Sequence, residues 1–589
     1  SINSIIKFDK LLLNKKYQDL IFFENGIIKT SFFEKNLLVK IDSEYSFLDK
    51  KYSKEKDNIK INIKKDKQED IVIETFFKNE NTKLNTKQLS KYINIDKKIL
   101  KDQDFIIDSN NKISFSIDKK NKINNLKINS ILSFDKLKID YISNKLKKII
   151  PNYQNEIFLT SDSVEINYSK NKTQIDAKGK YSFKDKKDNF DNFEMQIFTI
   201  NNGLNFTSSI ELNNAFIKVD NINFKKKKNI FSKVNVNGSY IDDKEFKIKE
   251  IKYLEDKNKI LISNLNISKN YKILNIDKFE LNYLNKKNNY NFIKFYKSKN
   301  NYNLISDVFD GEFLFNNLLD GKSNHSFLRI FQNLNSEIML SLDNFYVGNQ
   351  SYLNKIVGIL KIKNSKLNSA NIDALLNNKT KFSFILNTSS KKEIITNIVI
   401  DKPEPFIKNY KFIKGFKGGL LSYRSIEKNG KSKSKLKISD FKIKDMPALA
   451  KLLSLVSLPS FQGISDLLTG EGISFDEFDM DYESDRKNIK INEMYSIGPS
   501  ISILMNGYIE KNKLTSLRGT LVPATGLNKF ISSLPLLGDI LVGKKTGEGV
   551  IGVSFKIKGH PKNLKTTVNP IKTLTPRFIT RTLEKLKRN

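Results

Sequence analysis

The chain has 589 residues and a formal charge of +37, and 39% of its residues are hydrophobic, which excludes general disorder. It has no cysteine and two histidines, which excludes disulfides, thiolate metal sites and cysteine nucleophiles. No run of about 18 apolar residues is present, so we expect no membrane-spanning helix within these residues. We therefore expect a folded, non-enzymatic protein that holds no cofactor and no metal.

The positive charge leaves three interpretations open. Lys far exceeds Arg and is spread along the chain together with Asn and Ile, which favours a compositional bias of the genome at tolerant surface positions. Attraction to anionic membrane surfaces comes second. Nucleic-acid binding comes third, because base readout and bidentate phosphate contacts favour Arg, so no nucleic-acid partner is expected.

Apolar and polar residues alternate with period two from residue 59 to residue 557, and each such stretch predicts a strand with one apolar face. Polar clusters at 108–112, 184–189 and 510–513 predict turns. Strands follow one another every ~10–15 residues without helical crossovers, so the sheet should be mainly antiparallel. The alternating positions include Ile59, Ile61, Ile63, Ile113, Phe115, Ile117, Val164, Ile166, Tyr168, Ile175, Val234, Val236, Phe246, Ile248, Ile501, Ile503, Met505, Ile551, Val553, Phe555 and Ile557.

Helical patterns are few. The segments 89–102 and 134–152 could each hold a short helix. In 445–458, Asp445 suits the N-cap and Pro447 the first turn, and an apolar stripe follows. A short element at 464–468 and a basic helix at 576–589 complete the set. The chain therefore concentrates its helices near the C-terminal end.

The apolar face of such a sheet must be covered by a second sheet, by closure into a barrel or by a ligand. Stacked sandwiches would divide the chain into blocks of about 100 residues, whereas these strands continue without linkers. The short, lysine-interrupted strands disfavour an outer-membrane barrel. We expect an elongated, curled antiparallel sheet that forms a hydrophobic groove, with stacked sandwiches as the open alternative.

Several blocks in the second half resemble the AsmA-like family, in particular its large YhdP-type branch. They are "SEIMLSLDNFYVGN" (336–349), "VGILKIKNSKLNSANIDALL" (357–376), "FKGGLLSYRS" (416–425), a long block at 436–482, "IGPSISILMNGYIE" (497–510) and the segment 518–570. The match rests on their order and spacing. It divides the chain into a β-rich groove segment at 1–335, an AsmA-like region at 336–579 and a basic tail at 580–589.

The resemblance implies a protein that is anchored in the bacterial inner membrane and carries phospholipid across the periplasm through a hydrophobic groove, which supports the outer membrane. An envelope scaffold or outer-membrane assembly factor is the alternative. The expected partners are phospholipids, both membranes and other envelope proteins. The chain begins at Ser1 without a signal or anchor, so we expect an anchoring segment to precede it. No catalytic residue belongs to the family pattern.

Two sets of residues are the candidates for the site, and each has a simpler interpretation. The groove residues could instead be ordinary core, and the C-terminal gate residues could instead only plug the end of the sheet. The groove candidates are Ile113, Phe115, Val164, Ile166, Val234, Val236, Ile501, Ile503, Met505, Ile551, Val553, Phe555 and Ile557. The gate candidates are Leu449, Leu452, Leu453, Val456, Leu536, Leu537 and Leu541.

Two further motifs have structural interpretations that we prefer. The acidic run "DEFDMDYESD" (476–485) alternates with apolar residues, so it predicts a strand with an acidic face and not a calcium site. The segment "GKKTGEG" (543–549) lacks phosphate-loop spacing and predicts a hairpin turn.

Overall fold

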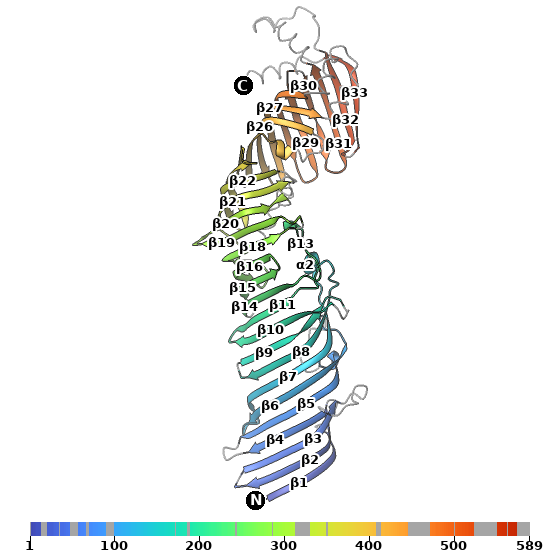
Figure 1. Ribbon diagram of the computed structural model, residues 1–589, viewed down its shortest axis with the longest axis vertical. Coiled ribbons are helices and arrows are strands. Elements are labelled where there is room, and N and C mark those ends of the chain that lie inside the picture. The colour runs from blue at the N-terminus through green and yellow to red at the C-terminus, as the bar shows by residue number, and fades with distance from the viewer. Residues whose placement is uncertain are drawn as a thin grey trace, which may run out of the picture. The chain divides into compact units, whose positions relative to one another are not determined.

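The computed structural model of the protein is almost entirely β (Figure 1). Its described strands, apart from a small hairpin, belong to one largely antiparallel 31-stranded sheet. It divides into unit 1, residues 1–297 with 330–332, and unit 2, residues 298–329 with 333–589. The described residues are 2–12, 21–34, 36–47, 57–65, 70–89, 99–170, 172–184, 189–241, 244–285, 287–312, 330–348, 351–407, 414–445, 472–499, 501–523, 551–561 and 563–573.

Unit 1 is an antiparallel meander in which the strands of the sheet pair with the next one along the chain, except that β17 and β18 both pair with β16 (Figure 1). The small β12–β13 hairpin stands outside the sheet, so β11 pairs with β14. The strands are β1 (Ile2–Leu12), β2 (Ile21–Phe33), β3 (Asn36–Phe47), β4 (Asp57–Lys65), β5 (Ile71–Asn85), β6 (Asp104–Ile117), β7 (Ile123–Asp140), β8 (Glu156–Ser169), β9 (Lys172–Ser182), β10 (Asp191–Ile200), β11 (Gly203–Glu211), β12 (Ile217–Val219), β13 (Phe224–Lys226), β14 (Ser232–Ile241), β15 (Glu245–Glu255), β16 (Asn258–Ser268), β17 (Ile273–Asn275), β18 (Lys278–Leu284) and β19 (Tyr290–Ser298).

Unit 2 begins with one parallel pair, β20 with β21, and continues as an antiparallel meander. The antiparallel prediction is therefore confirmed except at this pair. The strands are β20 (Asn301–Asp310), β21 (Ser336–Gly348), β22 (Ser351–Lys363), β23 (Lys366–Leu376), β24 (Thr380–Thr388), β25 (Ile394–Asp401), β26 (Lys414–Lys428), β27 (Lys431–Asp445), β28 (Ile473–Ser484), β29 (Asn488–Ile497), β30 (Ile501–Glu510), β31 (Leu514–Pro523), β32 (Ile551–His560) and β33 (Asn563–Thr573).

The two edges of the meander in unit 1 differ. At one edge, which we call the turn edge, tight connections at 170–171, 201–202 and 242–244 join successive strands. At the other, which we call the loop edge, longer connections at 86–103, 141–155 and 212–231 leave the sheet. The non-strand elements α1 (Thr86–Leu89), α2 (Asn144–Ile149) and η3 (Asp220–Ile222) all lie in connections of the loop edge.

The predicted turn at 108–112 is wrong, because β6 runs through it without a break. Asp, Ser and Asn favour turns, but backbone pairing to β5 and β7 keeps these residues extended. The turn at 510–513 is confirmed between β30 and β31. Most of 184–189 lies outside the described residues.

The helical predictions fare unevenly. The segment 134–152 holds the short helix α2, capped by the Ser143 side chain, after β7 has run on to Asp140. The segment 89–102 lies mostly outside the described residues, as do the helices predicted at 445–458, 464–468 and 576–589. The short helix α4 (Glu404–Ile407) of unit 2 was not predicted. The predicted boundary at 335–336 concerns a sequence relationship and stays a prediction.

Candidate functional site

The groove candidates of unit 1 all lie on one face of its sheet. Partners in an antiparallel ladder project to the same side, so the register assigns faces. One row runs from Ile166 through Ile175, Ile197 and Phe206 to Gly238. Parallel rows add the remaining positions, and we call this side the apolar face. Its predicted members are Ile113, Phe115, Val164, Ile166, Val234 and Val236.

Most side chains in the middle of the apolar face are half-buried, and few are fully buried. All six candidates have this intermediate exposure. Single-layer sheets leave such a face in contact with water unless something else covers it. The same intermediate exposure recurs at Ile28, Ile41, Ile61, Ile73, Ile128, Ile175, Ile197, Phe206, Ile251, Ile262 and Phe279.

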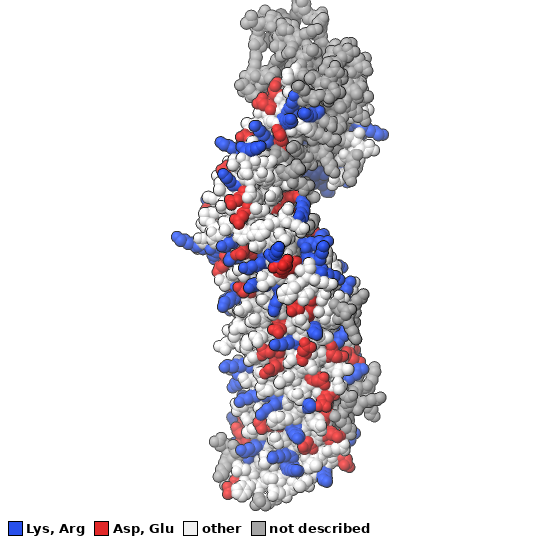
Figure 2. All heavy atoms as spheres, viewed as in Figure 1, with Lys and Arg blue, Asp and Glu red and all other residues white. Residues whose placement is uncertain are grey.

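The opposite face of unit 1 carries the charges. Lys29, Lys40, Asn62 and Glu74 form one row across β2 to β5. Cross-strand ion pairs follow, such as Lys178–Glu194 at 3.5 Å. Figure 2 shows Lys and Arg intermixed with Asp and Glu over the viewed face, without a separate basic patch. Some apolar side chains also lie on this charged face and are exposed, among them Val72, Phe76 and Ile131.

Small polar side chains interrupt the apolar face where strands bulge. Bulges displace the register next to Ser43, Asn79 and Ser161, and all three side chains are buried. Ser43 Oγ donates to the Glu24 carbonyl, which lies at the bulge, over 2.8 Å. A β-bulge leaves backbone groups without ladder partners and bends the strand, so small hydrogen-bonding side chains fit there.

The longest of these polar clusters crosses β4 to β7. Asp57 accepts hydrogen bonds from Thr82 Oγ1 over 2.7 Å and from Asn79 Nδ2 over 3.1 Å. Ser109 Oγ donates to Asn79 Oδ1 over 2.8 Å and accepts from Asn111 Nδ2 over 2.8 Å. Asn111 Oδ1 in turn accepts from Ser130 Oγ over 2.6 Å, so the cluster is internally satisfied.

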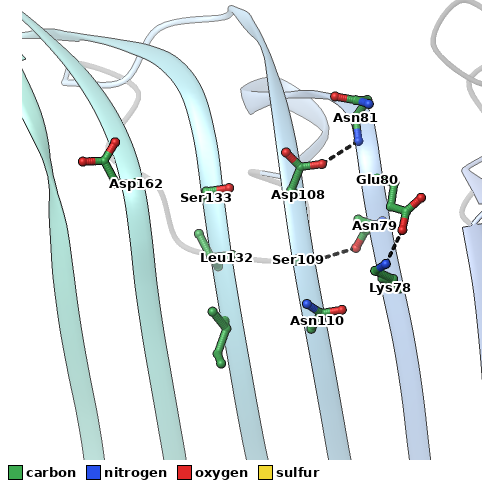
Figure 3. Close-up of a pocket in the computed structure, with 11 residues that line it drawn as sticks. Lys78, Asn79, Glu80, Asn81, Asp108, Ser109, Asn110, Leu132, Ser133 and Asp162 are labelled. Atoms are coloured by element: carbon green, nitrogen blue, oxygen red, sulfur yellow. Dashed lines mark hydrogen bonds and ion pairs between the residues drawn. The ribbon is translucent and has the colours of Figure 1, made fainter.

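Two shallow cavities lie at bulges of unit 1; the lining of the first is mainly polar, and the lining of the second mixes polar residues with Phe198, Phe206 and Ile248. The first, about 450 Å³, lies where β5 bulges at Glu80 and Asn81, and the Asn81 amide N–H donates to Asp108 (Figure 3). The second, about 540 Å³, lies near Lys249 and Asn264. Neither is an apolar ligand pocket, and the described residues contain no group of three or more His, Asp or Glu placed to hold a metal.

The groove candidates of unit 2 also share a face, but they are packed in a core. Ile501, Ile503, Phe555 and Ile557 are 0–7% exposed, and Met505 packs against them. They belong to what we call the C-terminal cluster, which consists of Ile407, Phe416, Ile438, Phe441, Ile443, Ile473, Phe475, Ile501, Ile503, Leu521, Phe555 and Ile557. For Ile551 and Val553 the structure describes only the backbone, which places them in β32.

Residues 476–484 of the acidic run lie in β28, as predicted, with apolar residues on the other face. Asp479 is buried and lies 3.2 Å from Lys435 Nζ and 3.4 Å from Lys437 Nζ. It also accepts a hydrogen bond from the Tyr495 hydroxyl. Burial and the nearby carboxylates raise the pKa of Tyr495. The run is thus a cross-strand charge network.

The gate candidates Leu449, Leu452, Leu453, Val456, Leu536, Leu537 and Leu541 lie outside the described residues, as do the segment 543–549 and the basic tail. His325 also lies outside them. A ring nitrogen of His560 is 3.1 Å from the Asn512 carbonyl oxygen, between two hairpins of unit 2. In the described part of the chain no helix has the length and apolarity to cross a membrane.

Comparisons with known proteins add no relative. No protein-family model matches the chain. No curated protein matches it either. The resemblance of 336–579 to the AsmA-like family therefore stays a prediction.

Two features of unit 1 could not be predicted from the sequence: the positions of the bulges and the buried lysine. Asn residues occupy positive-φ positions at several bulges, including Asn25, Asn81 and Asn264. Asn tolerates this conformation, but in an Asn-rich chain its presence does not single out a position. The buried lysine Lys226 lies in a run of lysines at 225–228, and nothing in the sequence separates it from its exposed neighbours.

Proposed function

We propose that the protein carries the acyl chains of phospholipids along the apolar face of unit 1, without catalysis. The observation that supports this most is the continuity of the face. Half-buried Ile, Val and Phe side chains follow one another from β2 to β18, and the register keeps them on one side. An apolar face of this extent is a binding surface or an aggregation hazard unless something apolar covers it.

Contact with such a face lowers the free-energy cost of moving an acyl chain through water. Exposing an acyl chain to water costs about 0.8 kcal/mol per CH₂ group, and contact with aliphatic side chains removes most of that cost. The apolar surface repeats from strand to strand, so a chain moving along it meets no large barrier. The headgroup stays in water beside the polar edge residues.

Curling of the sheet into a groove is part of the proposal. Bulges next to Ser43, Asn79 and Ser161 recur along the sheet, in the pairs β2–β3, β5–β6 and β8–β9, and bulged strands bend. Small side chains at these points allow a tight bend toward the apolar face. Bending repeated along neighbouring strands would turn the face into the lining of a gutter.

The setting rests on the resemblance to the AsmA-like family. We propose transport of phospholipid between the inner and outer membranes of a bacterial envelope, which supports outer-membrane integrity. In this setting the chain is periplasmic, is anchored in the inner membrane and works with other envelope proteins. The intermixed charges of the viewed face do not favour a polyanion as the ligand.

A scaffold that conducts no lipid is the second candidate, and one observation favours it. The C-terminal cluster is packed to exposures as low as 0% at Ile501 and 1% at Leu521, as in an ordinary core. If another protein packed against the apolar face of unit 1 as closely as the C-terminal cluster is packed, no lipid could bind there. The sheet would then have only a structural role.

The test is lipid retention by a matched pair of variants in β14. Val236→Asp places a charge on the apolar face, and Asn235→Asp places the same charge on the opposite face of the same strand. We expect native mass spectrometry of protein purified from bacterial envelopes in mild detergent to show bound phospholipid in the wild type and in Asn235→Asp. Val236→Asp should lose at least half of it.

Wild-type protein without lipid, under conditions that retain lipid in a known carrier, would contradict the proposal and favour the scaffold. Equal lipid in both variants would place the binding surface elsewhere. Circular dichroism of both variants verifies that the sheet is intact.

A further inference from the structure

The β12–β13 hairpin lies on the apolar face of unit 1. Tyr283 belongs to this face, because Leu281 two residues before it pairs with Ile260. The Tyr283 hydroxyl donates to the Ile222 carbonyl at the tip of the hairpin over 2.5 Å. Its ring also contacts Phe224 edge to face, with 5.8 Å between centroids. Tyr283 lies near the loop edge, so the hairpin covers that side of the face.

The helix α2 extends the cover to the opposite edge. It lies beside β12 of the hairpin. Lys145 of α2 places its Nζ 5.8 Å from the centroid of the Tyr271 ring. Tyr271 follows β16 at the turn edge, whereas α2 follows β7 at the loop edge. The connections 141–155 and 212–231 thus reach from one edge of the sheet to the other, and together we call them the clasp.

Buried polar contacts hold the clasp in place. Lys226 is 0% exposed, and its ammonium group donates to the carbonyls of Leu212 at 2.7 Å and of Asn213 and Ala215 at 3.0 Å. It also reaches the Lys227 carbonyl at 3.1 Å. A desolvated ammonium surrounded by carbonyls fixes the backbone around it, because moving any of them leaves a buried charge with fewer partners.

The clasp is tied to the sheet as well. Asp191, at the start of β10, accepts hydrogen bonds from the Asn214 backbone at 3.0 Å and from its side chain at 3.1 Å. The Tyr181 hydroxyl donates to the Glu211 carbonyl at 2.5 Å. These anchors lie at the root of the 212–231 connection, so they fix this part of the clasp at the loop edge.

The side chains in the centre of the apolar face, between the two contacts of the clasp, are partly exposed. Ile262 lies in the middle of β16, between its loop-edge end near the hairpin and its turn-edge end near Tyr271. It pairs with Ile251 and Phe279, and all three side chains are only half-buried. These central side chains are thus less buried than Leu281 and Tyr283, which lie on the loop-edge side of the same face at 4% and 1% exposure.

We propose that the clasp is a fixed bridge across the groove, beneath which acyl chains pass lengthwise. This inference rests on the proposed function. Between β14 and β18 the bridge then prevents lipids from entering or leaving the groove through its open side. It also limits the cross-section of the acyl chains that can pass beneath it. Entry and exit occur on either side of this stretch.

The test combines a tether with two photo-crosslinking positions. Lys145→Cys with Tyr271→Cys supplies the only thiols of the chain, which has no native cysteine, and a short bis-maleimide then locks the clasp to the turn edge. A photoreactive phenylalanine replaces Ile113, away from the clasp, or Ile262, beneath it. The full chain is incubated with vesicles of radiolabelled phosphatidylethanolamine, and crosslinked lipid is counted before and after tethering. Asn235, on the charged face, is the negative control position.

We expect crosslinking at both apolar positions, unchanged within twofold by the tether. Crosslinking at position 113 without crosslinking at 262 would overturn the bridge while leaving lipid binding intact. Loss of the signal at 262 after tethering would also overturn it, because the clasp would then have to open. Absence of lipid at both positions would instead contradict the proposed function. The experiment is repeated with the photoreactive phenylalanine at position 251 in place of position 262. The same result at both positions excludes a local folding defect at position 262 as its cause.

Discussion

At the scale of single residues, the environment separates chemically equal side chains. Lys225 and Lys228 are exposed, but Lys226 between them is buried among four carbonyls. Burial lowers the pKa of Lys226, and the nearby Glu255 and Asp191 partly oppose this effect. Whatever the origin of the excess of lysines, at least one of them, Lys226, has a specific structural role.

The substitution Lys226→Met tests that task. Met keeps the apolar stem and removes the ammonium group, which leaves buried carbonyls unpaired at a cost of about 3 kcal/mol. We expect the amides of β12 and β13 to exchange with solvent about a hundredfold faster in hydrogen-exchange mass spectrometry, with β1 to β6 unchanged. Lys228→Met is the matched control and should leave exchange unaltered. Equal protection in both variants would show that the carbonyl contacts do not hold the hairpin.

At the scale of elements, the bulges explain why polar residues are buried in an apolar face. Asn79, Ser109 and Asn111 would be unfavourable in the interior of a regular strand. Here they satisfy one another beside a bulge, and the bulge residue Asn81 adopts a positive φ of 50° that Asn tolerates. The departure from simple alternation marks the positions at which the strands bend.

Ser109→Ala measures the contribution of this cluster. It removes a buried hydroxyl that both donates and accepts, so we expect unit 1 to lose about 1–2 kcal/mol of unfolding free energy. Ser114→Ala, on the same strand but on the charged face, should change it by less than about 0.5 kcal/mol. Urea unfolding followed by tyrosine fluorescence gives both values. Similar values for the two variants would mean that solvent already satisfies the cluster.

At the scale of the whole molecule, buried tyrosines are a shared feature of both units. Burial is the main cause that raises the pKa of Tyr45, Tyr181 and Tyr253 in unit 1 and of Tyr495 in unit 2. Nearby carboxylates add to the effect at each of them. These hydroxyls stay protonated in the folded state at pH values where an unfolded chain would ionise them.

An alkaline dependence of stability follows, with a definite sign. A raised pKa in the folded state contributes stability that is fully present below the unfolded value of about 10 and is lost as pH rises above it. We expect the unfolding free energy to fall steeply above about pH 10. In a pH titration followed by absorbance at 295 nm, the exposed tyrosines should ionise gradually. The buried tyrosines should ionise only when the circular-dichroism signal of the sheet is lost cooperatively. Gradual ionisation of all tyrosines with the sheet intact would contradict the assigned burial.

The sequence by itself determined the antiparallel sheet and the residues of its apolar face, because period-two alternation is a local property that the backbone geometry imposes on every strand. Ile113, Ile166 and Val236 could be assigned to one side on that ground alone. Only the tertiary structure decided the parallel pair of β20 and β21, the continuation of β6 through 108–112 and the placement of α2 and the β12–β13 hairpin across the face. Those features depend on contacts between residues far apart in the chain, and local composition carries no record of which distant partner will satisfy a given backbone group or charge.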